Sequence, residues 1–363
     1  MKKSLIALAA VAASGAAFAQ SSVTVFGIVD TSVAYVNGQD NWSGLQNGGN
    51  ATSRLGFRGT EDLGNGLKAN FWLEGAVQPD TGDGSAAGKG YDFQRRATVG
   101  LSGNFGEVRL GRELTAAYNA TSRYDVFGQV GFGASKLWAD KGVNADSTTQ
   151  RVNNMVTYLS PDFSGFRANV NYGFGEDTDA QTGKSSNSAN RYMGAGVTYD
   201  NGPLSLGLGL ERRNDGTSTG AGVDAYDVNA WSLGGSYNFG VAKLAAAYRN
   251  SEAKYSTDGA KDKTKGYYVG VSAPVGAAGE VKASYNRYEV NTNIAGEPKL
   301  KADHFALGYV HNLSKRTALY GTYAYIKNKN VNGENLNARL STNVGLKDSG
   351  KQQAIQVGVR HAF

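Results

Sequence analysis

The sequence contains no cysteine, only 5 prolines and 3 histidines, and no long apolar run beyond its N-terminus. The lack of cysteine excludes disulfides, thiol chemistry and cysteine-ligated metal sites. No segment after residue 19 has the roughly twenty uninterrupted apolar residues that a membrane-spanning helix needs. What is abundant is glycine (50), tyrosine (20) and phenylalanine (14), a composition that favours strands, tight turns and aromatic girdles over helices.

The charge balance gives no sign of a polyanionic partner such as a nucleic acid. The formal net charge is only +6, and the basic residues form neither a run nor a helical face that could enter a nucleic-acid groove. Nucleic-acid binding is therefore not expected. A mean hydropathy of −0.40 would suit a soluble protein, but it also suits an outer-membrane barrel, in which only alternate residues face lipid.

Residues 1–19 have the pattern of a secretory signal peptide. Lys2 and Lys3 precede an apolar run, and Ala17–Ala19 provides a small-residue cleavage site. The apolar run is too short for a spanning helix, which is the alternative interpretation. We expect an exported protein whose mature chain begins at Gln20.

The last stretch, residues 351–363, alternates between apolar and polar positions. Ile355, Val357 and Val359 fall at every second position, which is the period of a strand with one apolar face. A strand of this kind at the end of a sheet would leave an exposed edge. Pairing with the first strand of the chain would close the sheet into a barrel and remove that edge.

The same alternation recurs along the whole chain. In the first strand Val23, Val25 and Val29 fall on one face and Asp30 on the other, so Asp30 is predicted to face the interior. The plainest apolar row is Leu204, Leu206, Leu208 and Leu210. About sixteen such strands can be counted, and the predicted fold is an all-β transmembrane antiparallel β-barrel comprising residues 20–363 as one domain. Barrels of this size enclose an aqueous channel.

The connections between these strands alternate between short and long. The turn at residues 61–66 is short, whereas a Gly- and Asn-rich loop is expected over residues 37–50. Short periplasmic turns and long outer loops are typical of transmembrane barrels. Residues 113–150 show no sustained alternation and are too many for an ordinary connection. In a wide barrel, we expect this segment to fold into the lumen.

Several ordered blocks of the sequence resemble the general trimeric porins of beta-proteobacteria. The blocks are SVTVFGIVD at 22–30, SRLGFRGTEDLGNGLKANFWLE at 53–74, VGLSGNFGEVRLGR at 99–112, YLSPDFSGF at 158–166, ALGYVHNLSKRTALYGTYAY at 306–325, and the terminal Phe363. They extend over essentially the whole mature chain. The resemblance implies a sixteen-stranded homotrimer in the bacterial outer membrane, in contact with lipid and lipopolysaccharide, whose third outer loop (113–150) forms a constriction.

The resemblance also implies an anion-preferring filter made of arginines on the barrel wall and acids on the facing loop. Alternation places Arg58, Arg96 and Arg151 inward, where such a cluster would lie. The full set of expected constriction residues is Arg58, Arg96, Arg151, Arg54, Arg95, Lys68, Glu113, Asp125 and Asp30. Clusters of arginine favour anions, and arginine stays protonated at physiological pH. The alternative is that these arginines only pair with acids and pin the loop.

The expected function is passive diffusion of small hydrophilic solutes and ions. A substrate-selective uptake channel, a plugged adhesive barrel and a barrel enzyme are the alternatives. An enzyme of the serine type would need a histidine beside its nucleophile. Alternation groups His311 and His361 with lipid-facing rows, and His304 is expected at the start of a strand. No catalytic residue is therefore assigned.

One acidic patch, residues 176–179, is a candidate for divalent cations. Acidic oxygen-rich loops bind such ions, but this spacing is not that of a recognised cage. A solvated loop is the favoured interpretation, and neither a metal nor a cofactor is expected.

Overall fold

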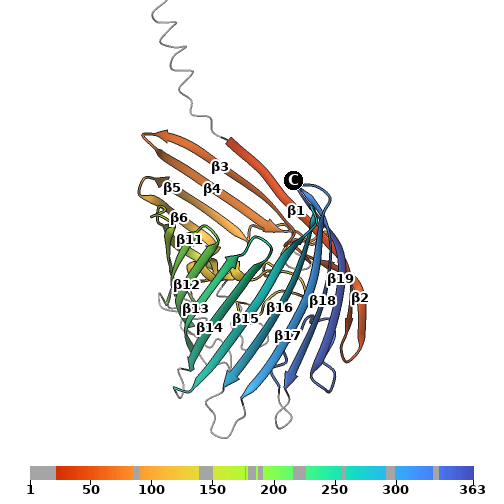
Figure 1. Cartoon of the computed structure of the whole chain (residues 1–363). Coiled ribbons are helices and arrows are strands. Elements are labelled where there is room, and N and C mark those ends of the chain that lie inside the picture. The colour runs from red at the N-terminus through yellow and green to blue at the C-terminus, as the bar shows by residue number, and fades with distance from the viewer. Residues whose placement is uncertain are drawn as a thin grey trace, which may run out of the picture.

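The structure is a computed structural model that describes residues 22–85, 90–138, 150–175, 177–178, 185–186, 191–215, 226–255, 259–291, 299–329 and 335–363. The expected signal peptide, residues 1–19, lies outside the described residues. The fold is a closed antiparallel β-barrel, as predicted (Figure 1). Its sheet contains seventeen strands, β1–β8 and β11–β19, and β9 and β10 form a separate pair.

The strands alternate along the chain with turns and loops. In the first half they are β1 (Ser22–Asn37), β2 (Asn41–Asn47), β3 (Arg54–Gly64), β4 (Leu67–Ala76), β5 (Arg96–Gly103), β6 (Gly106–Leu114), β7 (Arg151–Leu159), β8 (Phe166–Gly173), β9 (Asp177–Thr178) and β10 (Ser185–Ser186). In the second half they are β11 (Tyr192–Asn201), β12 (Leu204–Asp215), β13 (Tyr226–Asn238), β14 (Lys243–Tyr255), β15 (Lys261–Val275), β16 (Gly279–Asn291), β17 (Leu300–Asn312), β18 (Thr317–Lys329) and β19 (Lys351–Ala362).

The seventeen strands occupy sixteen positions around the barrel, because β2 and β3 share one edge of β1. β2 pairs with the second half of β1, from Thr31 to Asn37, and β3 pairs with the first half, from Ser22 to Ile28. The expectation that residues 37–50 form a loop is thus wrong in part. Its glycines and asparagines favour a loop, but pairing with the long β1 holds residues 41–47 extended.

The barrel closes between its first and last strands, as the terminal alternation predicted. β19 pairs antiparallel with β1 over ten residues, from Ile28 opposite Ala362 to Asn37 opposite Gln353. Phe363 continues the ladder: its amide donates to the Gly27 carbonyl at 3.0 Å, and the Gly27 amide donates to its carbonyl at 3.1 Å. No open edge therefore remains at the C-terminal strand.

The two faces of the wall differ as the alternation requires. Outward side chains are apolar and exposed, as in Leu206, Leu208 and Leu210, at 39–49% of their full accessible area. Inward side chains include buried polar groups such as Asp30, Asn286 and Gln356. An exposed apolar belt around a polar interior is stable only when hydrocarbon surrounds the barrel.

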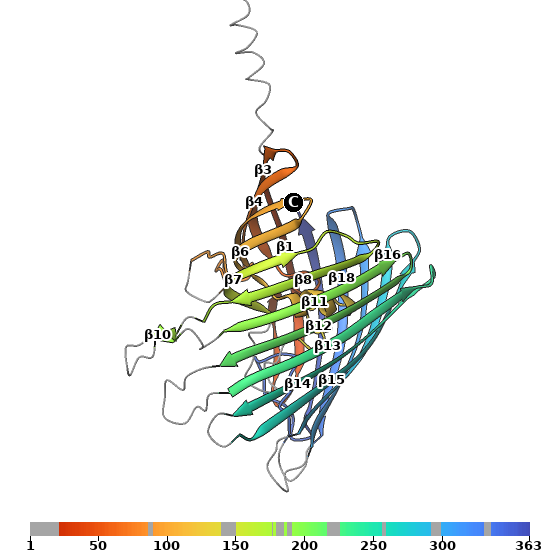
Figure 2. The same cartoon turned by 90° about the vertical axis from the view of Figure 1, so that its left-hand side faces the viewer.

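The two ends of the barrel also differ. Both ends of the described chain, Ser22 and Phe363, lie at the end that carries the short turns, and the long connections leave the strands at the other end (Figures 1 and 2). Short turns mark the periplasmic end of such a barrel and long loops its outer end. The sequence-based expectation for this asymmetry is confirmed.

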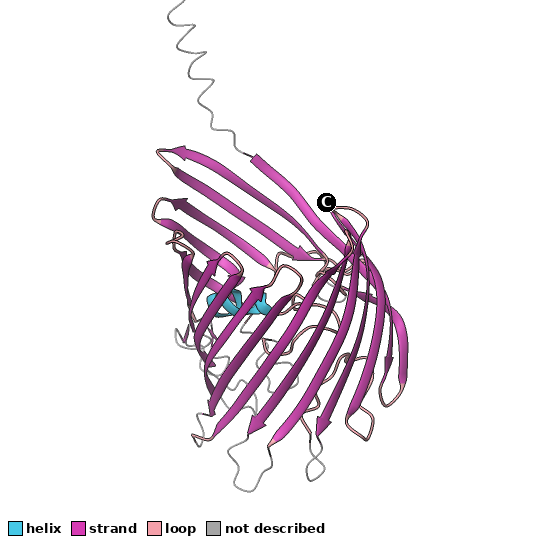
Figure 3. Cartoon of the chain, in the orientation of Figure 1, coloured by secondary structure: helices cyan, strands magenta, loops and turns pink. Residues whose placement is uncertain are grey.

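The described part of the long segment after β6, residues 115–138, folds into the barrel. It begins with helix α2 (Ala116–Thr121) and the 3-10 turn η1 (Ser122–Tyr124), which lie between the walls in Figure 3. Among the described residues, no helix is long and apolar enough to cross a bilayer. Helix α2 packs so closely on β12 that a Cβ at Gly207 would overlap the Ala120 carbonyl oxygen. Glycine is therefore required there.

The hydrophobic core lies inside the barrel, between this loop and one side of the wall. Loop residues Tyr124, Phe127 and Trp138 are buried against inward strand residues such as Tyr268 and Tyr288. The core therefore fixes the loop to the wall formed by β14–β19 and β1, and it includes no residue of β3–β7.

A charge in the outward apolar belt should impair membrane assembly. Leu233 is 52% exposed and lies between the exposed aromatics Trp231 and Tyr237 on the same face of β13. Leu233→Arg would place a cation in hydrocarbon and should cost about 2–4 kcal/mol of folding free energy. Unfolding from lipid vesicles measures this cost. The same change at lumen-facing Ser102 is the control, and equal destabilisation at both positions would contradict the assignment of the two faces.

Candidate functional site

A group of arginines lies on the part of the wall that the loop does not cover. They come from β3, β5, β6, β7 and the residue before β5, and we call them the arginine wall: Arg54, Arg58, Arg95, Arg96, Arg109 and Arg151. Alternation turns Arg58 and Arg96 inward because Phe57 and Ala97 take the outward positions. The wall thus concentrates guanidinium groups on one side of the lumen.

One end of the arginine wall is organised around Glu74. This carboxylate accepts from Arg95 Nε at 2.6 Å, lies 4.0 Å from Arg54 Nη1, and accepts from the Trp72 indole at 3.1 Å. Arg151 joins the group through its Nε, which donates to the Arg95 carbonyl at 2.8 Å. Glu74 therefore holds two arginines in place and neutralises one charge.

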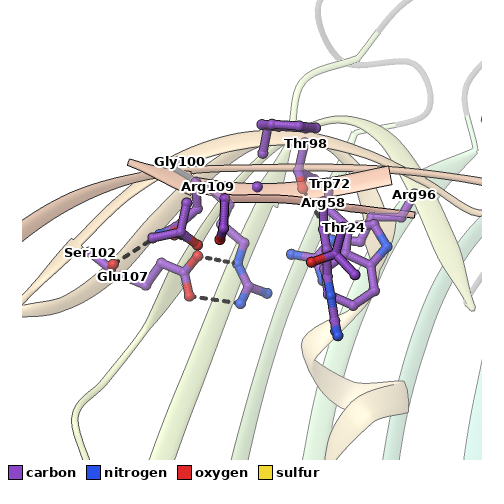
Figure 4. Close-up of a pocket in the computed structure, with 14 residues that line it drawn as sticks. Thr24, Arg58, Trp72, Arg96, Thr98, Gly100, Ser102, Glu107 and Arg109 are labelled. Atoms are coloured by element: carbon purple, nitrogen blue, oxygen red, sulfur yellow. Dashed lines mark hydrogen bonds and ion pairs between the residues drawn. The ribbon is translucent and has the colours of Figure 1, made fainter. Parts of the chain in front are cut away.

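The other end of the arginine wall, with Arg58, Arg96 and Arg109, lines a groove of about 440 Å³ (Figure 4). The guanidinium of Arg96 lies 4.6 Å from the Trp72 ring centre, and that of Arg58 lies 5.2 Å from it and 5.1 Å from Phe26. Stacking on aromatic faces restrains a guanidinium without using its N–H donors. Among the described residues, Arg58 has no carboxylate within 4.0 Å, so its donors face the lumen unpaired.

Two further acids partly balance the wall. Arg109 pairs with Glu107 at 2.7 Å and with Glu113 at 3.2 Å, and Glu113 also lies 3.6 Å from Arg96. Six arginines face three glutamates, which leaves an excess of three positive charges. The alternative that the arginines merely pair with acids thus describes several of them but cannot account for this excess.

The loop approaches the wall at Tyr118 of α2. Burial raises the pKa of the Tyr118 hydroxyl, and the neighbouring Arg151 and Arg95 oppose that shift, which places both arginines near the hydroxyl. The described part of the loop, residues 115–138, contains a single acid, Asp125. The expected row of loop acids facing the arginines is therefore not found in this part of the chain.

Asp125 does not face the lumen, which corrects the expectation for it. Its side chain is only 5% exposed and accepts hydrogen bonds from the amides of Phe127, Gln129 and Ser135 at 2.9–3.1 Å. The Tyr268 hydroxyl donates to it at 3.2 Å. Burial raises the pKa of Asp125, and these hydrogen bonds lower it. Its place in the structure is to fold the loop and attach it to β15.

Glu113 and Asp30 are also placed differently from the expectation. Glu113 belongs to strand β6, so it lies among the arginines and not on the facing loop. Asp30 does face the interior, but it is fully buried and accepts from the amides of Gly49, Asn50 and Ala51 and from the Tyr320 hydroxyl. It anchors the segment between β2 and β3, so it does not contact water in the lumen.

Lys68 lies away from the cluster. It is the second residue of β4, next to the short turn, opposite Asp62 and Ser102 in the ladder. Alternation predicts that the Lys68 side chain faces inward, but it does not predict the position of the residue along the barrel axis. Arg95, by contrast, precedes β5, so alternation does not predict which way its side chain points. Its contact with Glu74 shows that it belongs to the arginine wall.

Glu74 and Arg109 were missed as site residues. Alternation alone could have identified both residues. Glu74 lies two positions after Trp72, which faces inward, and Arg109 lies between Val108 and Leu110, which face outward. Alternation fails near Arg151, where the β6–β7 register shifts between Gly111 and Glu113 and Asn154 has a φ of 53°. A bulge of this kind redirects side chains and leaves no clear sequence signal.

The histidines do not form a catalytic group in the described structure. His304 is not at the start of a strand; it is the fifth residue of β17, fully buried, with its Nε2 3.0 Å from the Phe132 carbonyl oxygen. His311 and His361 bond to Tyr309 and Thr317 on the outer surface. Over the described ranges, no cluster of three potential metal ligands occurs. Of the acidic patch, Glu176 and Asp179 lie outside those ranges.

Comparisons with known proteins agree with this architecture. A family model described as Gram-negative porin matches residues 5–331. Outer membrane porin protein 32 of Delftia acidovorans is 49% identical, and the alignment covers all of both chains. The solved anion-selective porin from Comamonas acidovorans has a TM-score of 0.82 at 45% identity over 95% of this chain and 100% of that chain. A trimer form of an outer membrane protein of Vibrio cholerae shares the fold at 17% identity, with a TM-score of 0.70 over 94% and 99% of the two chains.

Proposed function

The chain belongs to the Gram-negative porin family, and on that basis we propose that it forms a water-filled outer-membrane channel that prefers anions. The channel would admit small hydrophilic solutes and inorganic ions by passive diffusion. The similar protein from Comamonas acidovorans is described as anion-selective, which supports the preference. The relatives are channels, so we assign no catalytic role to this chain.

The observation that carries the proposed selectivity is the charge excess of the arginine wall. Its guanidinium groups stay protonated at physiological pH, and the described loop residues opposite contribute no exposed acid. Arg58 supplies unpaired donors to a passing anion, whereas a cation would meet a net positive field. The loop confines permeating ions to the side on which these charges lie.

A salt gradient across a planar bilayer holding the purified protein tests the proposal. The sign of the reversal potential should show that chloride permeates better than potassium. The preference should weaken between 0.1 M and 1 M salt, because the Debye length falls from about 10 Å to about 3 Å. A cation-selective reversal potential would refute the proposed selectivity, and the absence of conductance would indicate a plugged barrel.

We also propose that the protein assembles as a homotrimer in contact with outer-membrane lipid and lipopolysaccharide. The support is the sequence resemblance to trimeric porins and a fold shared with a protein that has been solved in a trimer form. Single-channel recording tests the trimer, since insertion events should close in three equal substates. Single-step closure would contradict it.

Removal of one acid from the wall should strengthen the anion preference. Glu74→Gln leaves a side chain of similar size but raises the excess of the wall from three positive charges to four. The reversal potential should therefore move further in the anion direction. Glu289→Gln, which removes an acid from the outer surface, is the matched control and should change nothing. An equal shift in both variants would contradict the assignment of Glu74 to the filter.

A further inference from the structure

The outer mouth of the barrel contains a second cavity, separate from the arginine wall. It encloses about 980 Å³ and is bordered by β2, the connection after β4, the segment between β6 and β7, and the connection between β18 and β19. It shares no lining residue with the groove at the arginine wall. Sites for small molecules in proteins commonly enclose about 300–1,000 Å³. This cavity therefore has the size of a ligand site at the entrance of the channel.

Side-chain amides dominate the lining of this cavity, which we call the amide pocket. Three charged residues, Lys136, Arg339 and Asp80, leave its described lining with a net charge of only +1. An amide both donates and accepts hydrogen bonds, as a hydroxyl group does. The pocket therefore suits a neutral ligand rich in hydroxyl groups better than a simple anion. The six amide residues are Gln46, Asn47, Gln78, Gln150, Asn337 and Asn343.

One aromatic side chain, Trp42 of β2, also lines the amide pocket. Its ring reaches over Gly44 so closely that a Cβ at that position would overlap it. Trp42 packs in part on the hydrophobic core inside the barrel, but it is only half-buried. A sugar ring has a face of C–H groups, which packs on an aromatic face, and a rim of hydroxyls, which need hydrogen-bonding partners. The pocket offers both kinds of partner.

The connection between β18 and β19 is held in place where it borders the pocket. Gln352 accepts from the Leu340 and Ser341 amides at 2.6 and 3.0 Å, and its own amide donates to the Ser341 carbonyl at 3.1 Å. Asn328 donates to the Ala338 carbonyl and accepts from the Ala338 amide, both at 2.9 Å. A ligand would therefore meet polar groups that are already ordered, which lowers the entropic cost of binding.

The opposite sides of the pocket are also ordered by side-chain amides. Asn47 Nδ2 donates to Gln78 Oε1 at 2.7 Å, which orients the Gln78 amide. Gln150 Nε2 donates to the Trp138 carbonyl at 3.0 Å, which ties the residue before β7 to the loop inside the barrel. A ligand in the pocket would therefore lie directly against this loop, where it would obstruct the path of ions.

We propose that the amide pocket binds neutral oligosaccharides at the outer mouth of the channel. Trp42 packs on the face of one sugar ring, and the amides, together with Ser341 and Thr342, bond to the hydroxyls. The inference names a solute class for the proposed channel and rests on that function. It does not depend on the anion preference, because the arginine wall contributes nothing to the pocket.

Calorimetric titration of the detergent-solubilised full-length protein with maltotriose tests binding without any need for conductance. The wild-type protein should show saturable binding. The variant Gln46→Ala, Asn343→Ala removes two amides from the pocket and should lower the affinity about tenfold. The control variant Asn229→Ala, Asn250→Ala removes two amides from the outer surface of β13 and β14 and should bind as the wild type does.

A second pair of variants tests the aromatic contact. Trp42→Ala should lower the affinity for maltotriose at least about tenfold, because a buried tryptophan contact is among the strongest in an interface. Trp42→Phe keeps an aromatic face and should retain most of the affinity, which distinguishes lost stacking from lost folding. Trp231→Ala removes an outward tryptophan that is 41% exposed and should change nothing.

Current through a planar bilayer connects the pocket to the channel. Maltotriose should reduce the wild-type current saturably, and the Gln46→Ala, Asn343→Ala variant should need about ten times more sugar with an unchanged reversal potential. Anion-selective conductance without maltotriose binding would overturn the pocket alone. Maltotriose binding without conductance would support the pocket and refute the channel. Equal loss in pocket and control variants, or displacement of maltotriose by sulfate, would also overturn the proposal.

Discussion

Replacement of Arg58, Arg96 and Arg151 together by serine should abolish the anion preference of the channel and move its selectivity toward cations. The three substitutions leave three arginines beside three glutamates, so the wall loses its whole positive excess. Glu113 keeps its partner Arg109 at 3.2 Å, which means that no buried carboxylate is stranded. The barrel should therefore remain intact.

The reversal potential in a salt gradient measures this change directly. The matched control is the triple variant Arg212→Ser, Arg287→Ser, Arg316→Ser, which removes the same charge from the outer surface and a short turn. Only the wall variant should shift the potential, because charges more than a Debye length from the ion path are screened. An unchanged potential in the wall variant would show that the filter lies elsewhere.

Loss of the polar contacts that hold the loop to the wall should release it and increase the single-channel conductance. Three inward residues on consecutive strands bind the loop backbone. The Tyr268 hydroxyl accepts from the Val126 amide at 2.8 Å, the Tyr288 hydroxyl accepts from the Lys136 amide at 2.7 Å, and His304 Nε2 donates to the Phe132 carbonyl at 3.0 Å. These contacts fix residues 126–136 against β15–β17.

The variant Tyr268→Phe, Tyr288→Phe, His304→Leu keeps most of the apolar packing but removes all three contacts. Each buried backbone group left unpaired costs about 1–3 kcal/mol, so the docked loop should lose on the order of 3 kcal/mol or more. Larger and noisier current steps, with unchanged heat stability of the barrel, are the expected recording.

Tyr267→Phe, Tyr285→Phe, His311→Leu makes the same changes at outward positions of β15–β17 and serves as the control. Its conductance should equal that of the wild type. If the inward variant also kept the wild-type conductance, the polar contacts would not be what holds the loop, and the apolar packing of Phe127 and Trp138 alone would have to suffice.

Much of the fold was predictable because its determinants are local. Alternation assigned the outward rows, and the terminal strand required a partner that β1 provides. The length of segment 113–150 also indicated a loop inside the lumen, where the structure places its described part, residues 115–138. Residues 41–47 were misassigned because their composition is that of a loop, and only the excess length of β1 makes them a strand.

The candidate site was predictable in part. Alternation alone predicted that the side chains of Arg58 and Arg96 face inward. The same rule would have identified Glu74 and Arg109. It could not show that Asp30 and Asp125 are buried, since an inward carboxylate either contacts water or accepts from backbone amides. Which of these occurs depends on segments that alternation does not describe.

The sequence by itself determined a membrane barrel with a lumen, arginines on its inner face and a segment long enough to enter it. A period of two is a property of neighbouring residues, so it is visible within each strand segment without knowledge of the rest of the chain. Only the tertiary structure decided which acids neutralise the arginines and which ones hold the loop. Those partners are distant in sequence, as Asp125 and Tyr268 are at 143 residues apart, and they meet only because the closed wall brings them together.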